Sequence, residues 1–288
     1  MPDGAALPYR SWVPAAEADT VILALHGFND SRDAWAIPAP DFAAAGMAVY
    51  APDQRGFGAA PGRGLWPGKD ALVNDARVMA GLLRRRHPAA RMVLMGESMG
   101  GAVLMRLATL PDAPKVDAYV LAAPAVWGRA RMNVFMRSGL WLAANLVPGM
   151  TVGRPPPGIK VIPSDNEAAL LALARDPLTI RDTRFDTLNG LVNLMDAALA
   201  AARDFTARAL FLYGAHDDLV PKKATRATWN ALPDPERLAY YARGYHLLLR
   251  DLDRAAPIGD AIAWIRTPHA PLPSGADAAA ATWLRGAG

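Results

Sequence analysis

The sequence contains no cysteine among its 288 residues. Disulfide bonds, thiolate metal sites and a cysteine nucleophile are therefore excluded. The net charge is also small, because the chain has 31 Lys and Arg residues and 27 Asp and Glu residues, which gives a formal net charge of +4. The basic residues are scattered along the chain, whereas a nucleic-acid-binding surface gathers them on one face. We therefore expect no nucleic-acid partner.

Long hydrophobic runs are missing as well. The uncharged stretch at residues 138–153 is interrupted by Pro148 and Gly149, and it is shorter than the roughly 18 apolar residues that a membrane-spanning helix needs. The N-terminus shows no basic segment followed by an apolar one, so no secretory leader is visible. These two absences lead us to expect a cytoplasmic protein. With 52% hydrophobic and 20% charged residues, the chain still has ample apolar material for a large core.

Short apolar segments alternate with longer segments of helical character. The predicted strands are mostly apolar throughout, which is typical of parallel strands that are covered on both faces. They are residues 20–25, 47–51, 91–95, 116–122, 208–213 and 237–241, and the predicted helices are 34–45, 69–86, 99–110, 222–232 and 254–266. The alternation predicts an α/β fold with a mostly parallel central sheet flanked by helices.

The regular alternation stops after Pro124 and resumes at Arg208. The intervening chain is rich in Met, Trp, Phe and Leu, then in Pro and Gly over a predicted loop at 151–163, and it ends in helical patterns at 167–174 and 187–203. We therefore expect three parts. They are a core domain of residues 1–124 and 208–266, an inserted helical cap of residues 125–207, and a loose Pro/Ala/Gly-rich C-terminal tail of residues 267–288.

A candidate nucleophile lies in the segment Gly96-Glu97-Ser98-Met99-Gly100, which fits the pattern G-x-S-x-G. A predicted strand ends at this segment and a predicted helix follows it. In that context the serine stands on a sharp turn, where glycines allow neighbouring backbone to pass close by. The alternative is an ordinary glycine-rich turn in which Ser98 caps the helix. The flanking strand and helix favour the nucleophile.

A serine hydroxyl needs a base that removes its proton. The serine turn resembles that of the α/β-hydrolases, and in their topology the acid and then the histidine follow the serine along the chain. Of the five histidines, only His246 and His269 come late enough, and His269 lies in the Pro-rich tail. His246 is therefore the predicted base. The acid that orients it is expected after the strand at 208–213, where Asp217 and Asp218 both qualify.

Five sequence blocks resemble the serine-hydrolase branch of the α/β-hydrolase superfamily, and above all the bacterial lysophospholipases and monoacylglycerol lipases (serine aminopeptidase S33-like). The blocks are residues 26–29 (HGFN), 53–58 (DQRGFG), 96–101 (GESMGG), 214–221 (GAHDDLVP) and 245–251 (YHLLLRD), with a weaker sixth at 176–178 (DPL). The resemblance implies the α/β-hydrolase fold with an inserted helical cap.

Several residue roles follow from that resemblance. It favours Asp217 over Asp218 as the acid. It implies an oxyanion hole formed by the backbone N–H groups of Phe28 and Met99, which would stabilise negative charge as it develops. It gives His26 a structural role in orienting the loop that carries Phe28. Glu97 receives no chemical role.

The predicted function is hydrolysis of carboxylic esters through an acyl-enzyme on Ser98, without a metal or an organic cofactor. The apolar cap suggests a medium-to-long acyl chain, as in monoacylglycerol- or lysophospholipid-like esters, since flexible Met and flat aromatic side chains suit an adaptable acyl pocket. The candidate substrate-binding residues are Trp127, Phe135, Trp141, Leu191 and Met195. The alternative is that these side chains are simply cap core.

A membrane surface is a candidate partner of the cap. Arg129, Arg131 and Arg137 interleave with its apolar residues, which would favour contact with an anionic lipid surface, although a solvated helix face shows the same spacing.

Other functions fit the same residues. Ser98 excludes the dehalogenases and epoxide hydrolases of this fold, which use an aspartate nucleophile. Acyltransferases, perhydrolases, carbon–carbon bond hydrolases and small-ester carboxylesterases share the serine triad and are alternatives. A non-catalytic binding protein with a hydrolase fold is the alternative of another class, and the presence of all three triad residues argues against it.

Overall fold

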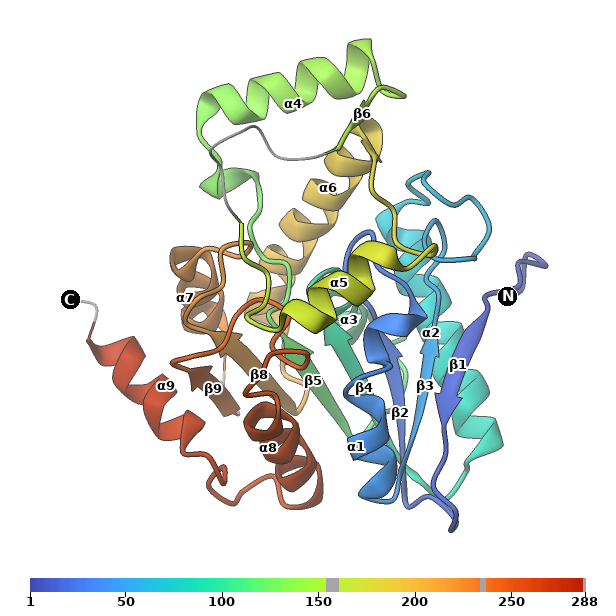
Figure 1. Ribbon diagram of the computed structural model, residues 1–288, viewed down its shortest axis with the longest axis vertical. Helices are drawn as coiled ribbons and strands as arrows, with labels where there is room; N and C mark the ends of the chain where they lie inside the picture. The colour runs from blue at the N-terminus through green and yellow to red at the C-terminus, as the bar shows by residue number, and fades with distance from the viewer. Residues whose placement is uncertain (154–160, 234–236, 287–288) are drawn as a thin grey trace.

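A seven-stranded sheet forms the centre of the molecule in the computed structural model, which describes residues 1–153, 161–233 and 237–286 (Figure 1). The strand order is β1-β3-β2-β4-β5-β8-β9. Only β1 runs antiparallel to its neighbour, and every other pair in this sheet is parallel. The strands are β1 (Tyr9–Trp12), β2 (Thr20–Leu25), β3 (Met47–Pro52), β4 (Arg91–Glu97), β5 (Ala118–Ala122), β8 (Ala209–Gly214) and β9 (Arg237–Tyr241). The predicted α/β fold with a mostly parallel sheet is confirmed.

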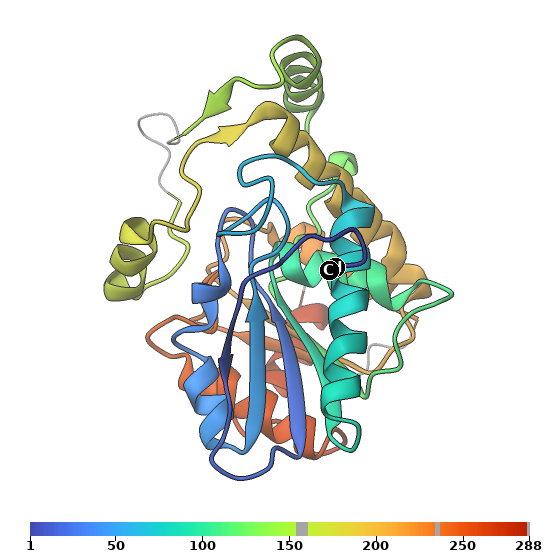
Figure 2. The ribbon, with the colours of Figure 1, turned by 90° about the vertical axis from the view of Figure 1, so that its right-hand side faces the viewer.

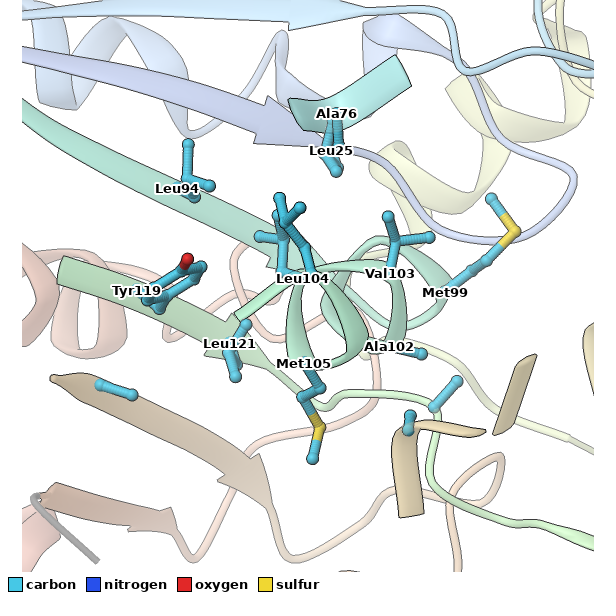
Figure 3. Packing of buried hydrophobic residues seen from close by; sticks show 14 of the residues in the cluster. Leu25, Ala76, Leu94, Met99, Ala102, Val103, Leu104, Met105, Tyr119 and Leu121 are labelled. Carbon is cyan, nitrogen blue, oxygen red and sulfur yellow. The ribbon is translucent and has the colours of Figure 1, made fainter. Parts of the chain in front are cut away.

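Both faces of the sheet are covered, which is why its inner strands are apolar at nearly every position. Alternate residues of each strand point to opposite faces, so that Leu23 and Leu94 join one core cluster while Ile22 and Val93 join the other. The first face is covered by α2 (Lys69–Arg86), α3 (Met99–Ala108) and α7 (Lys222–Ala231), and the second by α1 (Ala39–Ala44) and α8 (Ala255–Arg266). Figure 3 shows side chains of α3 beside those of β4 and β5.

The helix predicted at 34–45 is instead two short helices, η1 (Arg32–Trp35) and α1. Pro38 precedes the first residue of α1 and Pro40 lies in its first turn. Proline has no backbone N–H and fixes its own φ, so it starts a helix more readily than it continues one.

The loops that follow β2 and β4 diverge at the carboxyl edge of the sheet. The strands are direct neighbours, yet the chain continues from β2 to α1 on one face and from β4 to α3 on the other. A crevice forms where neighbouring connections leave toward opposite faces, and ligands of open α/β sheets bind there. The fold therefore places residues 26–31 and Ser98 at the position expected for a site.

The cap is inserted between β5 and β8, which are hydrogen-bonded neighbours in the sheet. It stands above the carboxyl edge of the sheet, and α6 runs from the cap down to the core (Figure 2). Its elements are η2 (Arg129–Arg131), α4 (Val134–Leu146), β6 (Thr151–Val152), α5 (Glu167–Arg175), β7 (Thr183–Arg184), α6 (Phe185–Ala201) and η3 (Ala202–Asp204), with β6 and β7 paired antiparallel. They fall within residues 125–207, whose status as a separate domain stays a prediction. Of the loop predicted at 151–163, residues 154–160 lie outside the described residues.

Membrane-spanning segments were not expected from the sequence. Within the described residues, no helix is long and apolar enough to cross a membrane.

The C-terminal segment is not the loose tail that its composition suggested, because α9 (Ala276–Arg285) packs against β9 at the edge of the sheet (Figure 1). Its Trp283 stacks on Tyr240 with ring centroids 4.9 Å apart and meets Trp229 edge to face at 5.4 Å. The guanidinium of Arg226 lies 4.3 Å from the centroid of the same indole. The alanine run favours helix formation, and the tryptophan supplies the apolar anchor that holds the helix to the sheet.

We expect Trp283→Ala to lower the free energy of unfolding by about 2 kcal/mol, which is less than the cost for a fully buried aromatic because Trp283 is half-buried. Urea unfolding followed by circular dichroism measures the change. Trp141→Ala is the matched control, since Trp141 is 63% exposed, and it should change stability by less than about 0.5 kcal/mol. Equal effects of the two substitutions would show that α9 does not stabilise the core.

Candidate active site

Ser98 lies between β4 and α3 in a strained backbone conformation, with φ 50° and ψ −111°. Its N–H donates to the carbonyl of Ala122 at 2.9 Å, which ties the turn to the neighbouring strand. A Cβ atom on Gly96 would overlap the backbone of Gly100, and one on Gly100 would overlap the carbonyl of Leu25. The glycines of the G-x-S-x-G pattern are therefore required by close backbone contacts, as the sequence predicted.

The predicted acid and the predicted base are hydrogen-bonded to each other. Asp217 Oδ2 lies 2.8 Å from His246 Nδ1, and both residues are buried. The other carboxylate oxygen of Asp217 accepts the N–H groups of Leu219 and Val220, each at 2.8 Å. Asp218 is exposed to solvent. The structure thus brings Asp217, and not Asp218, to the predicted base.

The loop that carries His246 is fixed against the end of β8. A Cβ atom on Gly214 would overlap the carbonyl of Gly244, so glycine is needed for this contact. The carboxylate of Asp251 accepts the N–H of Tyr245 at 2.7 Å, and burial raises the pKa of Asp251 to about 6. These contacts hold the imidazole in place beside Asp217.

The environment of His246 favours its protonated form. Burial alone would lower the pKa of the imidazole, but the charge of Asp217, its hydrogen bond and the charge of Glu97 outweigh burial, so the pKa lies above the ordinary value of 6.5. Since the ring uses Nδ1–H to donate to Asp217, its Nε2 is the nitrogen that can act as base. The pair can therefore accept a proton and stabilise the resulting cation.

The loop after β2 lies directly beside Ser98. A Cβ atom on Gly27 would stand 3.5 Å from the Cβ of Ser98. His26 is buried, and its Nε2 accepts the N–H of Gln54 at 3.0 Å while Nδ1 donates to the carbonyl of Gly27 at 2.7 Å. Burial lowers the pKa of His26, in agreement with the neutral ring that these two hydrogen bonds require. His26 thus has the structural role expected of it, which is to orient the loop.

Phe28 follows this orienting contact and lines the same cavity as Ser98. Met99 is the first residue of α3 and directly follows Ser98. The N–H groups at the first turn of a helix have no partner within the helix and are suited to bind negative charge. The assignment of the Phe28 and Met99 N–H groups to an oxyanion hole stays a prediction.

The cap binds the same loop from above. Asn29, at φ 61°, donates from Nδ2 to Thr183 Oγ1 at 2.6 Å, and its carbonyl accepts the N–H of Ile180 at 2.8 Å. Ser31 Oγ donates to Asp176 Oδ2 at 3.2 Å. The weak sixth sequence block, at 176–178, is therefore the point at which the returning cap chain contacts the loop that carries Phe28.

A largely apolar cavity of about 540 Å³ joins these parts. Trp127, Leu191 and Met195, three of the five candidate substrate-binding residues, line it, and their role in substrate binding stays a prediction. The prediction was wrong for Phe135 and Trp141, which are 84% and 63% exposed on the outside of α4. The cavity is also lined by residues that the sequence did not single out, among them Met132, Leu140, Leu188, Val192 and Leu219.

The reason for the misplacement lies in the helical period of α4. Its half-buried residues, 140, 143 and 144, lie on one face. Positions 135 and 141 point away from that face, because each residue turns the helix by about 100°. Apolar composition alone does not show which face of a helix is turned inward.

Three charged residues of the cavity wall also escaped the sequence analysis as functional residues. Arg250 lies 2.9 Å from Asp30 and 2.7 Å from Glu97, and all three line the cavity with Ser98 and His246. The only signal in the sequence is their position, since each lies inside or next to a block that carries the family resemblance.

The remaining histidines are placed elsewhere. His87 contacts the hydroxyl of Tyr50 at 2.9 Å, His216 stacks on Tyr245, and His269 is exposed. The choice of His246 over His269 as the partner of Asp217 agrees with this arrangement.

Two charged residues of the block at 53–58 hold neighbouring loops together. Asp53 accepts the N–H of Ala59 at 2.7 Å and pairs with Arg32, while Arg55 pairs with Asp75 at 2.8 Å. These contacts fix the loop after β3, which lies beside the loop that carries Phe28.

Similar proteins are known. In sequence, the chain is 25% identical over 276 residues to the monoacylglycerol lipase of Mycolicibacterium smegmatis, covering 91% of this chain and 93% of that protein. It is 26% identical over 259 residues to the monoglyceride lipase of Mus musculus, covering 87% and 82%. In structure, it resembles a monoacylglycerol lipase from Paleococcus ferrophilus with a TM-score of 0.75 at 20% identity, over 90% of this chain and 98% of that one.

A soluble variant of the monoglyceride lipase of Saccharomyces cerevisiae, in complex with a substrate analogue, also has a TM-score of 0.75 at 20% identity, over 91% and 92% of the two chains. At this identity the structural likeness establishes the α/β-hydrolase fold. The serine aminopeptidase S33 family matches residues 16–253. Because that match spans most of the chain and includes Ser98, Asp217 and His246, this chain belongs to the serine aminopeptidase S33 family of α/β-hydrolases.

Proposed function

We propose that this chain is a carboxylic ester hydrolase that cleaves monoacylglycerol- or lysophospholipid-like esters through an acyl-enzyme on Ser98. One observation carries the proposal: Ser98 and His246, with His246 bound to Asp217, line a single largely apolar cavity. The two curated relatives are named as lipases of monoacylglycerols, which supports an ester with one long acyl chain.

The reaction follows from the groups that line the cavity. Ser98 attacks the ester carbonyl while His246 Nε2 takes its proton, and Asp217 stabilises the imidazolium. The N–H groups of Phe28 and Met99 bind the oxyanion of the tetrahedral intermediate. His246 then gives the proton to the leaving alcohol, and a water molecule activated by His246 releases the acyl group from Ser98.

The roles within the triad can be tested by substitution. Ser98→Ala should abolish turnover and leave the fold intact, since the side chain only loses its hydroxyl. Asp217→Asn should lower kcat by about 10⁴-fold, because the amide no longer holds the imidazole in the required tautomer. Asp218→Asn is the matched control and should stay near the wild-type rate.

The measurement is steady-state hydrolysis of a nitrophenyl ester, together with labelling of Ser98 by a fluorophosphonate. A greater loss from Asp218→Asn than from Asp217→Asn would reverse the choice of acid. Wild-type turnover by Ser98→Ala would refute the nucleophile.

The cavity favours a long acyl chain on energetic grounds. Its wall is made of side chains such as Trp127, Leu191 and Met195, and each methylene group that leaves water for such a wall gains about 0.8 kcal/mol. Polar side chains line the cavity as well, among them Ser98, His246 and the charged residues Asp30, Glu97 and Arg250. The acyl chain therefore fits the apolar part, with its carbonyl at Ser98.

We expect kcat/KM to rise along a nitrophenyl ester series from acetate to dodecanoate, by up to about fourfold per methylene before the cavity is full. Met195→Trp should shorten the preferred chain because the larger side chain occupies the cavity. Leu142→Trp, on the exposed outside of α4, is the control and should leave the preference unchanged. Activity confined to acetate would contradict an acyl-chain pocket.

Contact with an anionic lipid surface forms part of the proposal. The helix α4, VFMRSGLWLAANL, contains no acidic residue and exposes a broad apolar surface made up of Val134, Phe135, Met136, Trp141, Leu142 and Leu146. Arg131 and Arg137 are exposed beside it. Apolar and cationic side chains on one exposed helix are the combination that binds anionic lipid interfaces. Leu140 of the same helix lines the cavity, so a lipid surface at α4 would lie close to the acyl site.

Vesicle co-sedimentation tests this contact. The wild-type chain should bind vesicles of phosphatidylglycerol more tightly than vesicles of phosphatidylcholine, and added salt should weaken the binding. The double substitution Phe135→Ser and Leu146→Ser should reduce binding at least about tenfold, while hydrolysis of a water-soluble butyrate ester stays unchanged. Leu82→Ser, an exposed leucine on α2, is the control, and an equal loss from this variant would contradict a role for α4.

A further inference from the structure

A buried charge cluster lies beside the proposed triad, and the reaction described above gives it no role. Arg250 is 5% exposed. Its Nη1 lies 2.9 Å from Asp30 Oδ2, and its Nη2 lies 2.7 Å from Glu97 Oε1. Both carboxylates are buried as well. One guanidinium thus spans two acidic groups that come from different parts of the chain.

Each member of the cluster lies in, or directly beside, a different loop of the site. Asp30 lies two residues after Phe28, and its Oδ1 accepts the N–H of Ser31 at 2.8 Å, within the loop after β2. Glu97 is the last residue of β4 and directly precedes Ser98. Arg250 lies in the turn that follows His246, where its N–H donates to the carbonyl of Leu247 at 2.7 Å. The cluster therefore connects the three loops that supply the oxyanion site, the nucleophile and the base.

Stability alone does not account for such a cluster. The free energy lost when two carboxylates and a guanidinium leave water is about as large as the free energy gained from their mutual attraction. Apolar residues of similar volume at the same positions often give a fold of equal stability. What the guanidinium supplies is geometry, because its planar fork directs separate N–H donors at fixed angles. A lysine ammonium at the same place has the charge but not the fork.

Resting on the proposed function, we propose that Arg250 is a positioning residue, whose bonds to Asp30 and Glu97 hold the loop of Phe28 and the turn of Ser98 in register with His246. The positioning matters because small displacements of reacting groups reduce rate steeply, by about 10²-fold for a shift near 1 Å. The Phe28 N–H is the donor most sensitive to such a shift, because residues 26–31 form a loop, whereas Met99 is the first residue of α3.

The cluster also acts on the charge of the base. The groups that face His246 are Asp217, Glu97 and Arg250: the two carboxylates raise the pKa of the imidazole, while Arg250 and burial lower it. Since the base works in its neutral form, kcat/KM falls on the acid side as His246 is protonated. A change in the charge of Glu97 should therefore appear as a displacement of this acid limb.

Arg250→Lys is the first test. It keeps the charge and loses the fork, so we expect KM to stay within about twofold and kcat to fall by about 10- to 100-fold. Labelling of Ser98 by a fluorophosphonate should slow in parallel, with the melting temperature little changed. Arg243→Lys is the control, since the side chain of Arg243 is 82% exposed and pairs with Asp253 at the surface, and it should keep the wild-type kcat.

Glu97→Gln is the second test. It keeps an oxygen acceptor for Arg250 but loses the negative charge, so the acid limb of kcat/KM should move to lower pH. Arg250→Lys should leave that limb nearly in place, because the positive charge remains. At constant folded fraction, a residue that only stabilises the fold would not change kcat.

Should Arg250→Lys fail to fold, the triple substitution Arg250→Met, Asp30→Asn and Glu97→Gln removes all three charges and leaves no buried ion unpaired. We expect this variant to fold and to show the same loss of kcat. Wild-type kcat in a folded Arg250→Lys or triple variant overturns the positioning role, and so does a loss of kcat that merely follows the folded fraction. If Ser98→Ala is inactive while Arg250→Lys is normal, only this inference fails; if Ser98→Ala is active, the proposed function fails first.

Discussion

Ser98 holds a backbone conformation that side-chain-bearing residues rarely adopt, with φ 50°, and the rest of the site is arranged around it. The strained turn persists because it is held on both sides, by the hydrogen bond from the Ser98 N–H to Ala122 on the neighbouring strand and by the close approach of Gly100 to Leu25. These contacts exist only because β4 is flanked by β2 and β5 in the sheet. The order of the strands therefore determines where the Ser98 hydroxyl, the proposed nucleophile, lies.

The other parts of the site depend on the same edge of the sheet. The loop after β2 lies beside the serine, the loop after β8 brings Asp217, and the turn after β9 brings His246 to it at 2.8 Å. Asn29 and Ser31 are in turn bound by Thr183 and Asp176 of the cap. Cap and core consequently meet at the loop that carries Phe28, the oxyanion candidate. A change in the position of the cap would therefore displace this loop.

The sequence predicted those features that are encoded locally. Parallel strands such as β2 and β4 are apolar at nearly every position, and the serine turn has a pattern of its own, so both could be recognised without knowledge of their neighbours. The edge strand β1, YRSW, was missed because it is short and largely exposed, and because two polar residues separate Tyr9 from Trp12, so that it forms no apolar run. The helix α9 was missed because alanine, which favours a helix, resembles an unstructured tail when only composition is considered.

Relations between distant segments could not be predicted in the same way. Whether Asp217 or Asp218 reaches His246 depends on the path of one loop, which the spacing of the residues leaves undetermined. The pairing of Arg250 with Asp30 and Glu97 requires three distant segments of the chain to meet. In the sequence, each of these residues taken alone would be expected on the surface, as charged residues usually are. The orientation of Phe135 and Trp141 depends on which face of α4 packs against α6. Because apolar residues occur all around α4, its sequence does not show which face is buried.

The position of the cap insertion has a consequence for how such proteins can diversify. β5 and β8 are directly hydrogen-bonded to each other, with Leu121 opposite Phe211, although the whole cap lies between them in the chain. The sheet is therefore continuous without any cap residue. A longer, shorter or differently folded cap can be exchanged at this junction with every strand register of the central sheet preserved. Substrate preference is therefore free to vary while the sheet that positions Ser98, Asp217 and His246 stays the same.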